Sequence, residues 1–355
     1  PDTGFTSLIL FGEQFEATAI PALRAVPHAL EEGSGYDGQF YAQLALDPLL
    51  SSDAITTALD SPAYRGRRIL LPWAASLLGL GQPWFVLQAY ALLNVFSWVG
   101  VAILLFRWLP PGSLRPTLAW TACVLSDGLM TSMRQALPDG ASVLLLALGV
   151  VAVEQNRRVL AAAVLGLAGL ARETNLIGGL VLAPSRVTLR TLATFMLQGL
   201  LVVAPLLLWI GYLWHTGLPP DAAGHRNFAV PFTGYIDKWF ITVRTLGADG
   251  WDSFARFSLF GLVSLTTQFL VLVWLRDWGN AWWRMGVAYA GLMAVLGPAV
   301  WEGDPGAVTR VVVPMTIAFN VLLPRLRWFW PLWVLGNISV LHGVEVMRVP
   351  WLSGW

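Results

Sequence analysis

The sequence predicts an all-α protein that crosses a membrane several times, with a large loop before its first full span. Of its 355 residues, 56% are hydrophobic, and the mean hydropathy is +0.62. Only 12% of the residues are charged, whereas soluble domains have about 25%. Long apolar stretches alternate with short arginine-rich connections. A bilayer accommodates such a surface, and we expect about 8–10 membrane segments.

The elements follow from the lengths of the apolar stretches. Residues 1–65 are of mixed polarity and predict short surface helices joined by loops. Residues 68–81 are apolar but shorter than the ~20 residues of a normal span, so we expect an interfacial or re-entrant helix. Residues 1–83 are then the first loop, and 84–355 the transmembrane domain; whether a span precedes Pro1 stays open. Apolar stretches suited to membrane segments lie at 84–108, 117–133, 137–153, 159–183, 189–214, 254–275, 283–300, 306–323 and 328–346.

One of these stretches is interrupted by charge. Arg172-Glu173-Thr174-Asn175 lies inside 159–183. Polar, non-helical backbone at membrane depth is tolerated only where it lines protein or a wet cavity. The interruption therefore predicts a broken span or a short hairpin whose polar turn faces a cavity.

The charge bias of the short connections orients the spans. The five connections at 107–116, 154–158, 184–190, 276–284 and 324–327 contain ten arginines and only two acidic residues, Glu154 and Asp277. This asymmetry is typical of cytoplasmic loops. Alternation then places 1–83, 133–139, 215–253 and 301–305 on the opposite, extracytoplasmic face. It also requires both ends of 159–183 to lie on the cytoplasmic side, which favours the hairpin.

Several function classes are disfavoured by composition. A formal net charge of +1 argues against nucleic acid, whose binding proteins carry basic stripes. A lone cysteine, Cys123, excludes an internal disulfide and a thiolate metal cluster. The four histidines are scattered, without the i,i+4 pair of a zinc helix. None is expected beside a carboxylate deep in a span, which disfavours membrane acyl transfer. Acidic oxygens suit a divalent cation, but no spacing is diagnostic.

Three short segments carry a resemblance. The Gly35-Tyr36-Asp37-Gly38-Gln39-Phe40-Tyr41 segment, Asp60-Ser61-Pro62-Ala63-Tyr64-Arg65 with Arg67-Arg68-Ile69, and the turn at 172–175 resemble bacterial polytopic proteins of cell-surface glycopolymer formation. Those proteins are similar in layout to the GT-C class of glycosyltransferases. The resemblance implies an essential acidic residue in the first extracytoplasmic loop and a polyprenyl-phosphate sugar donor. It also implies a multi-pass protein of the bacterial inner membrane.

Asp37 is the candidate general base. Sugar transfer from a lipid phosphate needs one carboxylate to accept the acceptor's proton. Because the phosphate is already a good leaving group, no second carboxylic acid is needed, unlike in glycoside hydrolysis. Gly35 and Gly38 leave room for a tight backbone. The alternative is an ordinary Gly-Asp-Gly turn with an aromatic anchor.

Arginine is the natural partner of the phosphate, because the chain contains a single lysine, Lys238, and guanidinium binds phosphate in a bidentate manner. A headgroup-binding patch at 65–68 and structural ion pairs of Arg134 with Asp139, or of Arg172 with Glu173, are alternatives. Glu302, Asp304 and Arg310 could hold a sugar, a cation or one another. The candidate phosphate-binding residues are Arg65, Arg67, Arg68, Arg134, Arg172 and Arg310. The candidate sugar- or acceptor-binding residues are Tyr36, Gln39, Tyr41, Asp139, Glu173, Glu302, Asp304, His225 and Arg226.

The leading function is transfer of a sugar from a polyprenyl-phosphate carrier to an extracytoplasmic glycan or lipid. The 215–253 segment is expected to be a loop, either a solvated connector or a lid over the site. A glycolipid transporter or flippase is the main alternative, but it predicts interrupted helices in both halves of the chain. The interruption at 172–175 has no clear counterpart in the other half of the chain. A non-catalytic subunit of a cell-envelope assembly is a third possibility.

Overall fold

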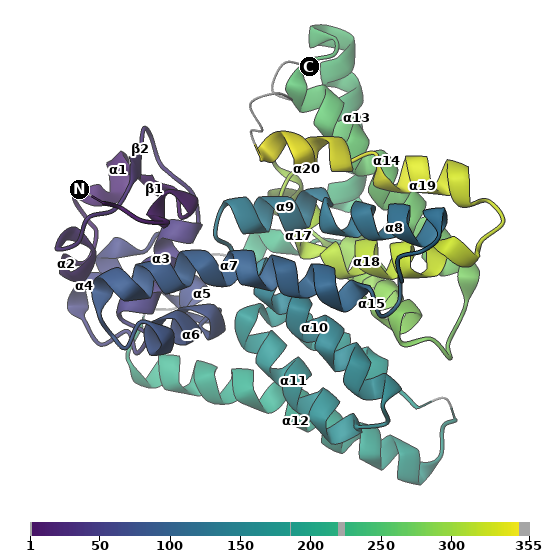
Figure 1. The fold of residues 1–355 in the computed structure, drawn as a ribbon, viewed down its shortest axis with the longest axis horizontal. Helices are drawn as coiled ribbons and strands as arrows, with labels where there is room; N and C mark the ends of the chain where they lie inside the picture. Colours follow the sequence, from purple (N-terminus) through teal and green to yellow (C-terminus); the bar gives the residue numbers. More distant parts are fainter. Residues whose placement is uncertain (1, 185, 219–223, 348–355) are drawn as a thin grey trace.

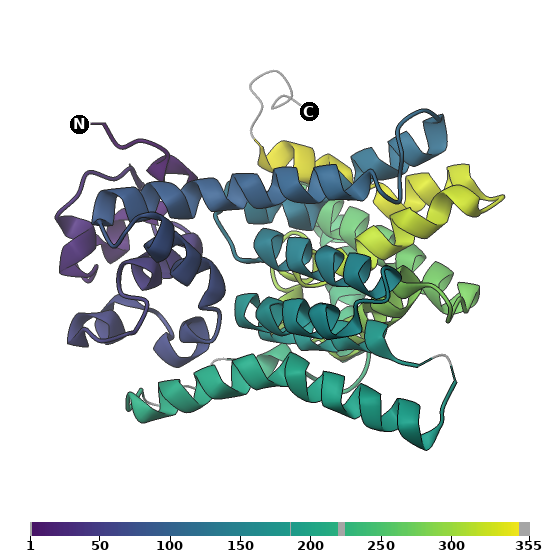
Figure 2. The same ribbon diagram turned by 60° about the horizontal axis from the view of Figure 1, so that its bottom comes forward.

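The computed structural model describes residues 2–184, 186–218 and 224–347, and these residues are mostly helical (Figure 1). The buried apolar residues form one cluster in an N-terminal lobe, a larger one in a body of packed helices, and a small third one around Phe319 and Phe329. Figures 1 and 2 show the lobe at one end of the body, with α7 and α12 both extending to it. Trp209 of α12 donates from Nε1 to the Gly66 carbonyl oxygen of the lobe over 2.7 Å. The lobe is therefore fixed to the body by a buried polar contact as well as by apolar packing.

The lobe consists of the short elements expected of 1–83. One small departure from the all-helical prediction is a parallel pair of two-residue strands, in which Phe11 lies opposite Leu30. The helix 68–81 is also present, as α6. The lobe's elements are η1 (Thr6–Leu8), β1 (Phe11–Gly12), α1 (Glu13–Glu16), α2 (Pro21–Arg24), β2 (Leu30–Glu31), α3 (Gly38–Leu46), α4 (Asp53–Ala58), α5 (Pro62–Gly66) and α6 (Leu70–Leu78).

Within the described residues, three helices are long and apolar enough to cross a membrane: α7 (Pro83–Leu105), α12 (Leu189–His215) and α14 (Ser253–Leu275). They match three of the stretches predicted as spans, and they indicate a membrane protein. The other stretches form shorter or consecutive helices: α8 (Leu114–Val124), α9 (Asp127–Arg134), α10 (Asp139–Glu154), α15 (Ala281–Val295), α16 (Pro298–Trp301), α17 (Val308–Val311), α18 (Val313–Leu322), η4 (Leu323–Arg325), α19 (Phe329–Asn337) and α20 (Val340–Val346).

The predicted hairpin at 159–183 is confirmed. Helix α11 (Arg158–Ala171) ends where Arg172 adopts extended backbone, and the chain returns as the 3-10 helix η2 (Glu173–Leu182). Arg158 Nη1 donates to the Leu182 carbonyl oxygen over 3.3 Å. The two ends of the stretch are thus neighbours, and the polar turn lies at the far end.

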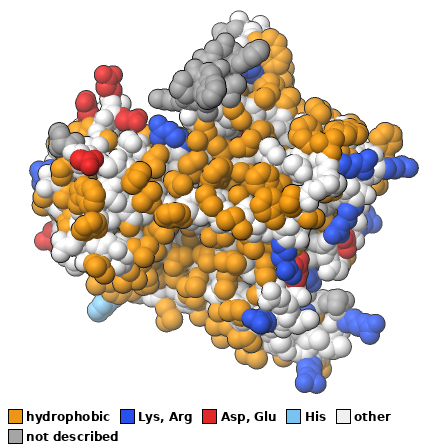
Figure 3. Space-filling model, in the orientation of Figure 1, with side chains coloured by type: hydrophobic (Ala, Val, Ile, Leu, Met, Phe, Trp, Pro, Cys, Tyr) orange, Lys and Arg blue, Asp and Glu red, His pale blue; other side chains and the backbone are white. Residues whose placement is uncertain are grey.

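The arginine-rich connections gather at one end of the body, as the alternation predicts. Arg107 Nε lies 3.0 Å from a Glu154 carboxylate oxygen, which joins the first two connections. Arg284 Nη1 donates to the Ala183 carbonyl oxygen over 2.8 Å, which joins the next two. Figure 3 shows most of the visible basic side chains at this end, away from the lobe. The surface between this end and the lobe is largely apolar.

The expectation of a loop over 215–253 is wrong for much of that segment. It contains η3 (His225–Asn227) and the helix α13 (Thr233–Asp249), while residues 219–223 lie outside the described part. The polar residues of α13 obscure its helical pattern in the sequence. Its Tyr235 and Trp239 lie four residues apart, on one face of the helix, and pack against the core of the body. The described residues of this segment are therefore a structured part of the body.

Candidate functional site

The two glycines that flank Asp37, Gly35 and Gly38, lie where no larger residue would fit. Gly35 has φ +62°, and a Cβ there would lie 2.4 Å from the Gly12 nitrogen. A Cβ at Gly38 would lie 2.4 Å from the Gln135 carbonyl oxygen. Both neighbours are backbone atoms and cannot rotate away. The two glycines therefore hold Asp37 at the start of α3, where 37% of its side chain is exposed.

Arg65 is held between two carboxylates. Its Nη2 donates to Asp37 Oδ1 over 2.8 Å, and Nε and Nη2 donate to both Asp60 oxygens over 2.9 and 2.7 Å. The guanidinium is buried, and Tyr41 accepts from its Nη1 over 3.4 Å. One cation thus lies between two anions, which leaves one net negative charge at this wall.

Arg68 forms a bidentate pair with Glu173, which lies 105 residues away. The two hydrogen bonds, from Nε and Nη2, measure 2.9 and 2.8 Å; the Tyr64 hydroxyl also accepts from Nη2, and the Tyr41 hydroxyl accepts from Nη1. This pair is electrically neutral. It joins the first loop to the turn of the hairpin.

Asp139 is the common partner of Arg172 and Arg310. Its side chain is 3% exposed, and it forms an ion pair with Arg172 Nη1 and lies 3.7 Å from Arg310 Nη1. Two cations share one buried anion here, so this wall carries one net positive charge. The anticipated pairs of Arg134 with Asp139 and of Arg172 with Glu173 are not the ones that form.

These groups surround one cavity of about 160 Å³. It lies where the first loop, the hairpin turn, η3 and α17 meet. The ionic group of Asp37, Asp60 and Arg65 is net negative and that of Arg172, Arg310 and Asp139 is net positive, while the Arg68–Glu173 pair is neutral. The charged residues that line it are Asp37, Arg65, Arg68, Arg172, Glu173 and Arg310.

The charge of Asp37 is set by its surroundings. Burial alone would raise the pKa of its carboxyl, but the charge and hydrogen bond of Arg65 outweigh burial, with help from Arg310 and Arg68. The pKa of Asp37 therefore lies below its ordinary value. The group is ionised at neutral pH and able to accept a proton.

Two predicted sugar-binding residues have structural contacts instead. Gln39 is buried, accepts from the Gly12 amide over 3.1 Å and donates to the Ser34 carbonyl oxygen over 2.8 Å. Tyr41 is buried beneath Arg65 and Arg68. Of the predicted phosphate-binding residues, the half-buried Arg67 and Arg134 do not line the cavity. Gln39 and Tyr41 do not line the cavity either; Gln39 contacts the backbone of the lobe, and Tyr41 contacts two arginines that form the cavity wall.

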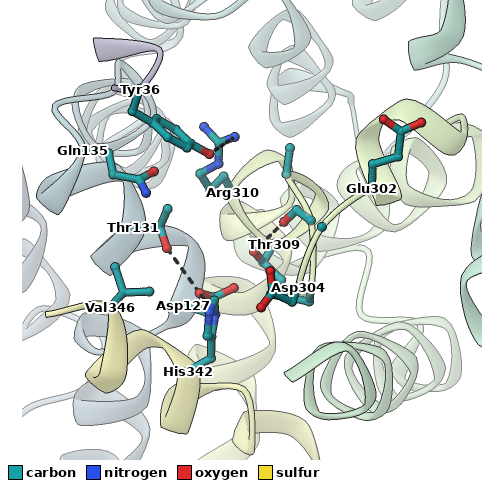
Figure 4. Close-up of a pocket in the computed structure, with 14 residues that line it drawn as sticks. Tyr36, Asp127, Thr131, Gln135, Glu302, Asp304, Thr309, Arg310, His342 and Val346 are labelled. Atoms are coloured by element: carbon teal, nitrogen blue, oxygen red, sulfur yellow. Dashed lines mark hydrogen bonds and ion pairs between the residues drawn. The ribbon is translucent and has the colours of Figure 1, made fainter. Parts of the chain in front are cut away.

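Some of the other predicted residues line an adjacent cavity of about 430 Å³ (Figure 4). Tyr36, Glu302 and Asp304 line it, and Arg310 lines both cavities. Glu302 is paired with exposed Arg226 over 2.6 Å, and not with Arg310. The side chain of His225 lies outside the described part of the structure.

Sequence reasoning missed the partners that hold the site together. Asp60 and Tyr64 were noted only as parts of a motif, although Tyr64 precedes Arg68 by four residues, the spacing of side-chain neighbours on a helix. Asn227 of η3 lines the cavity and donates to the Tyr64 hydroxyl over 3.4 Å, which links 215–253 to the first loop. This segment therefore forms part of the cavity wall.

One histidine lies beside a buried carboxylate, but outside the three described helices that are long and apolar enough to cross a membrane, so the expectation about carboxylates deep in a span stays a prediction. His342 Nδ1 lies 2.7 Å from Asp127 Oδ1, across 215 residues of sequence. No local spacing could have indicated this pair. Among the described residues, no group of three or more His, Cys, Asp or Glu side chains is arranged to hold a metal ion.

Comparisons of the chain with protein-family models, with curated proteins and with solved structures give no match.

Proposed function

We propose that this chain is a membrane glycosyltransferase of the GT-C kind. It transfers a sugar from a polyprenyl-phosphate donor to a glycan or lipid acceptor at the extracytoplasmic face of a bacterial inner membrane, across about 8–10 membrane segments. The observation that carries the proposal is the charge-separated cavity. Asp37, Arg68, Arg172 and Arg310 come from distant parts of the chain, yet they line one site opposite the arginine-rich end.

The two walls of the cavity suit the two halves of the reaction. The bond between the sugar's anomeric carbon and the phosphate oxygen breaks, and the phosphate leaves with the bonding electrons. A bond forms from the anomeric carbon to the acceptor oxygen, whose proton passes to Asp37. The hydroxyl becomes acidic as this bond forms, so a carboxylate of low pKa suffices. The excess cationic charge at Arg172 and Arg310 stabilises the leaving phosphate.

The ion pairs of the four cavity arginines indicate which of them are available to bind phosphate. Arg65 and Arg68 each donate four hydrogen bonds to carboxylates and tyrosines, so their guanidinium groups position Asp37 and Glu173. Arg172 and Arg310 share one carboxylate between them. The phosphate is therefore bound chiefly by these two, a narrower set than the sequence suggested.

Arg310→Gln is expected to weaken binding of farnesyl phosphate, a short polyprenyl monophosphate, by at least about tenfold. The change removes a charge-assisted contact but leaves Asp139 paired with Arg172, so the fold should survive. Arg310→Lys should restore binding only in part, because an ammonium lacks the fork geometry. Calorimetric titration of the protein in lipid nanodiscs measures the affinity.

Arg67→Gln is the matched control, since Arg67 is half-buried like Arg310 but does not line the cavity. Its affinity should equal that of the wild type. Equal affinity of the wild type and Arg310→Gln would remove Arg310 from the phosphate site.

A further inference from the structure

The larger cavity beside the donor site is lined mostly by side chains that the proposed mechanism does not use. Asp127 and Thr131 of α9 line one wall, His342 of α20 lies beneath them, and Asp304 faces them from the segment before α17 (Figure 4). Its volume of about 430 Å³ falls within the range of about 300–1,000 Å³ that is typical of small-molecule sites. It is therefore large enough for a ligand of its own.

Two acceptor atoms in this wall have no partner among the described residues. The Asp127 side chain is 3% exposed; its Oδ1 accepts from Thr131 and contacts His342, but its Oδ2 has no hydrogen-bond donor. Gln135 Oε1, from the turn after α9, is also buried without a donor. Buried polar atoms are normally hydrogen-bonded, and an unpaired carboxylate oxygen is costly. Both residues line the cavity, so a bound molecule is a candidate donor to these atoms.

The lining indicates what kind of molecule this is. Acceptors predominate, so the ligand must supply several donors: they are the carboxylates of Asp127, Asp304 and Glu302, the last of which is paired with Arg226, and the Gln135 amide oxygen. Tyr36 adds an aromatic wall, and Arg310 and His342 add cationic or N–H donors, which argue against a purely cationic ligand. Many hydroxyl donors with an apolar ring face, and no charge, describe a sugar ring.

We infer that this cavity binds a neutral saccharide through Asp127, Gln135 and Asp304. As a deduction that rests on the proposed function, this saccharide is the acceptor of the transferred sugar. Arg310 and Ala307 line both cavities, so the acceptor would lie directly beside the donor phosphate.

Saturation-transfer NMR tests the inference with the methyl glycosides of glucose, galactose and mannose on full-length protein in nanodiscs. At least one should receive saturation at its ring protons. Asp304→Asn and Asp127→Asn should each lower its affinity by at least about tenfold, the loss expected for hydrogen bonds to a charged group. Asp304 is exposed, so its variant should fold even if the Asp127 variant does not. Asp277→Asn, an exposed change in an arginine-rich connection, is the control and should bind as the wild type does.

Farnesyl phosphate, added in a second titration, separates the two proposals. Its affinity should be unchanged in Asp304→Asn. Saccharide binding without farnesyl phosphate binding in the wild type would uphold the saccharide site and contradict the glycosyltransferase. Two results with the glycosides would overturn the saccharide site: no glycoside binds, or a folded Asp304→Asn protein binds the glycoside as tightly as the wild type does. Tetramethylammonium serves as a purely cationic probe, and binding of this cation but of no glycoside would also overturn the site.

Discussion

Asp37→Asn is expected to reduce the rate of sugar transfer by about 10²–10⁴-fold, the usual contribution of a general base. The amide keeps the size of the side chain, and its oxygen can still accept from Arg65 Nη2. It cannot take the acceptor's proton. Binding of farnesyl phosphate should persist, because Arg172 and Arg310 are untouched. Initial rates with a labelled polyprenyl-phosphate sugar, and phosphate affinity measured in parallel, separate the two effects.

Asp60→Asn is the matched control for this experiment. Asp60 contacts the same guanidinium, and its side chain is as exposed as that of Asp37, but it does not line the cavity. Its rate should fall far less than that of Asp37→Asn. A fully active Asp37→Asn enzyme would contradict the assignment of the base and leave Glu173 as the other carboxylate that lines the cavity.

Asp139→Ala is expected to destabilise the protein by about 3–5 kcal/mol, because removal of one partner from a buried ionic cluster leaves uncompensated charge. Here two guanidinium groups, of Arg172 and Arg310, would lose their shared anion. Arg172 Nε already has no hydrogen-bond partner among the described residues. Denaturant titration in detergent, followed by tryptophan fluorescence, measures the change.

Glu154→Ala removes an ion pair of a different kind and serves as the comparison. The Glu154 and Arg107 side chains are 31% and 45% exposed, and exposed pairs contribute only about 0–1 kcal/mol. Equal unfolding free energies for the two variants would show that Asp139 does not neutralise a buried cluster.

The arrangement of the long helices could be predicted from the sequence because apolar length and arginine bias are local signals. The same signals place the hairpin turn near the first loop, so Asp37 and 172–175 were expected at one face. Breaks within the shorter stretches were harder to predict. The chain between α8 and α9, for example, is interrupted at Leu125 and Ser126 without a proline or glycine.

The pairings inside the site could not be predicted because they join distant residues. Sequence reasoning favoured a pair between adjacent Arg172 and Glu173. Arg172 is extended, with φ −159° and ψ 124°, and neighbouring side chains on extended backbone point to opposite sides. Arg172 therefore meets Asp139, while Glu173 meets Arg68. Likewise, nothing near Asp127 in the sequence indicates His342.

Reconstitution of the purified wild-type protein in liposomes tests the central claim most directly. The donor is a polyprenyl-phosphate sugar with the label on the sugar, and the acceptor is an extract of cell-envelope glycans and lipids. The account predicts that label appears in a new glycosidic bond and that free polyprenyl phosphate accumulates in equal amount. Movement of the intact labelled lipid to the other leaflet, with no glycoside formed, would contradict it.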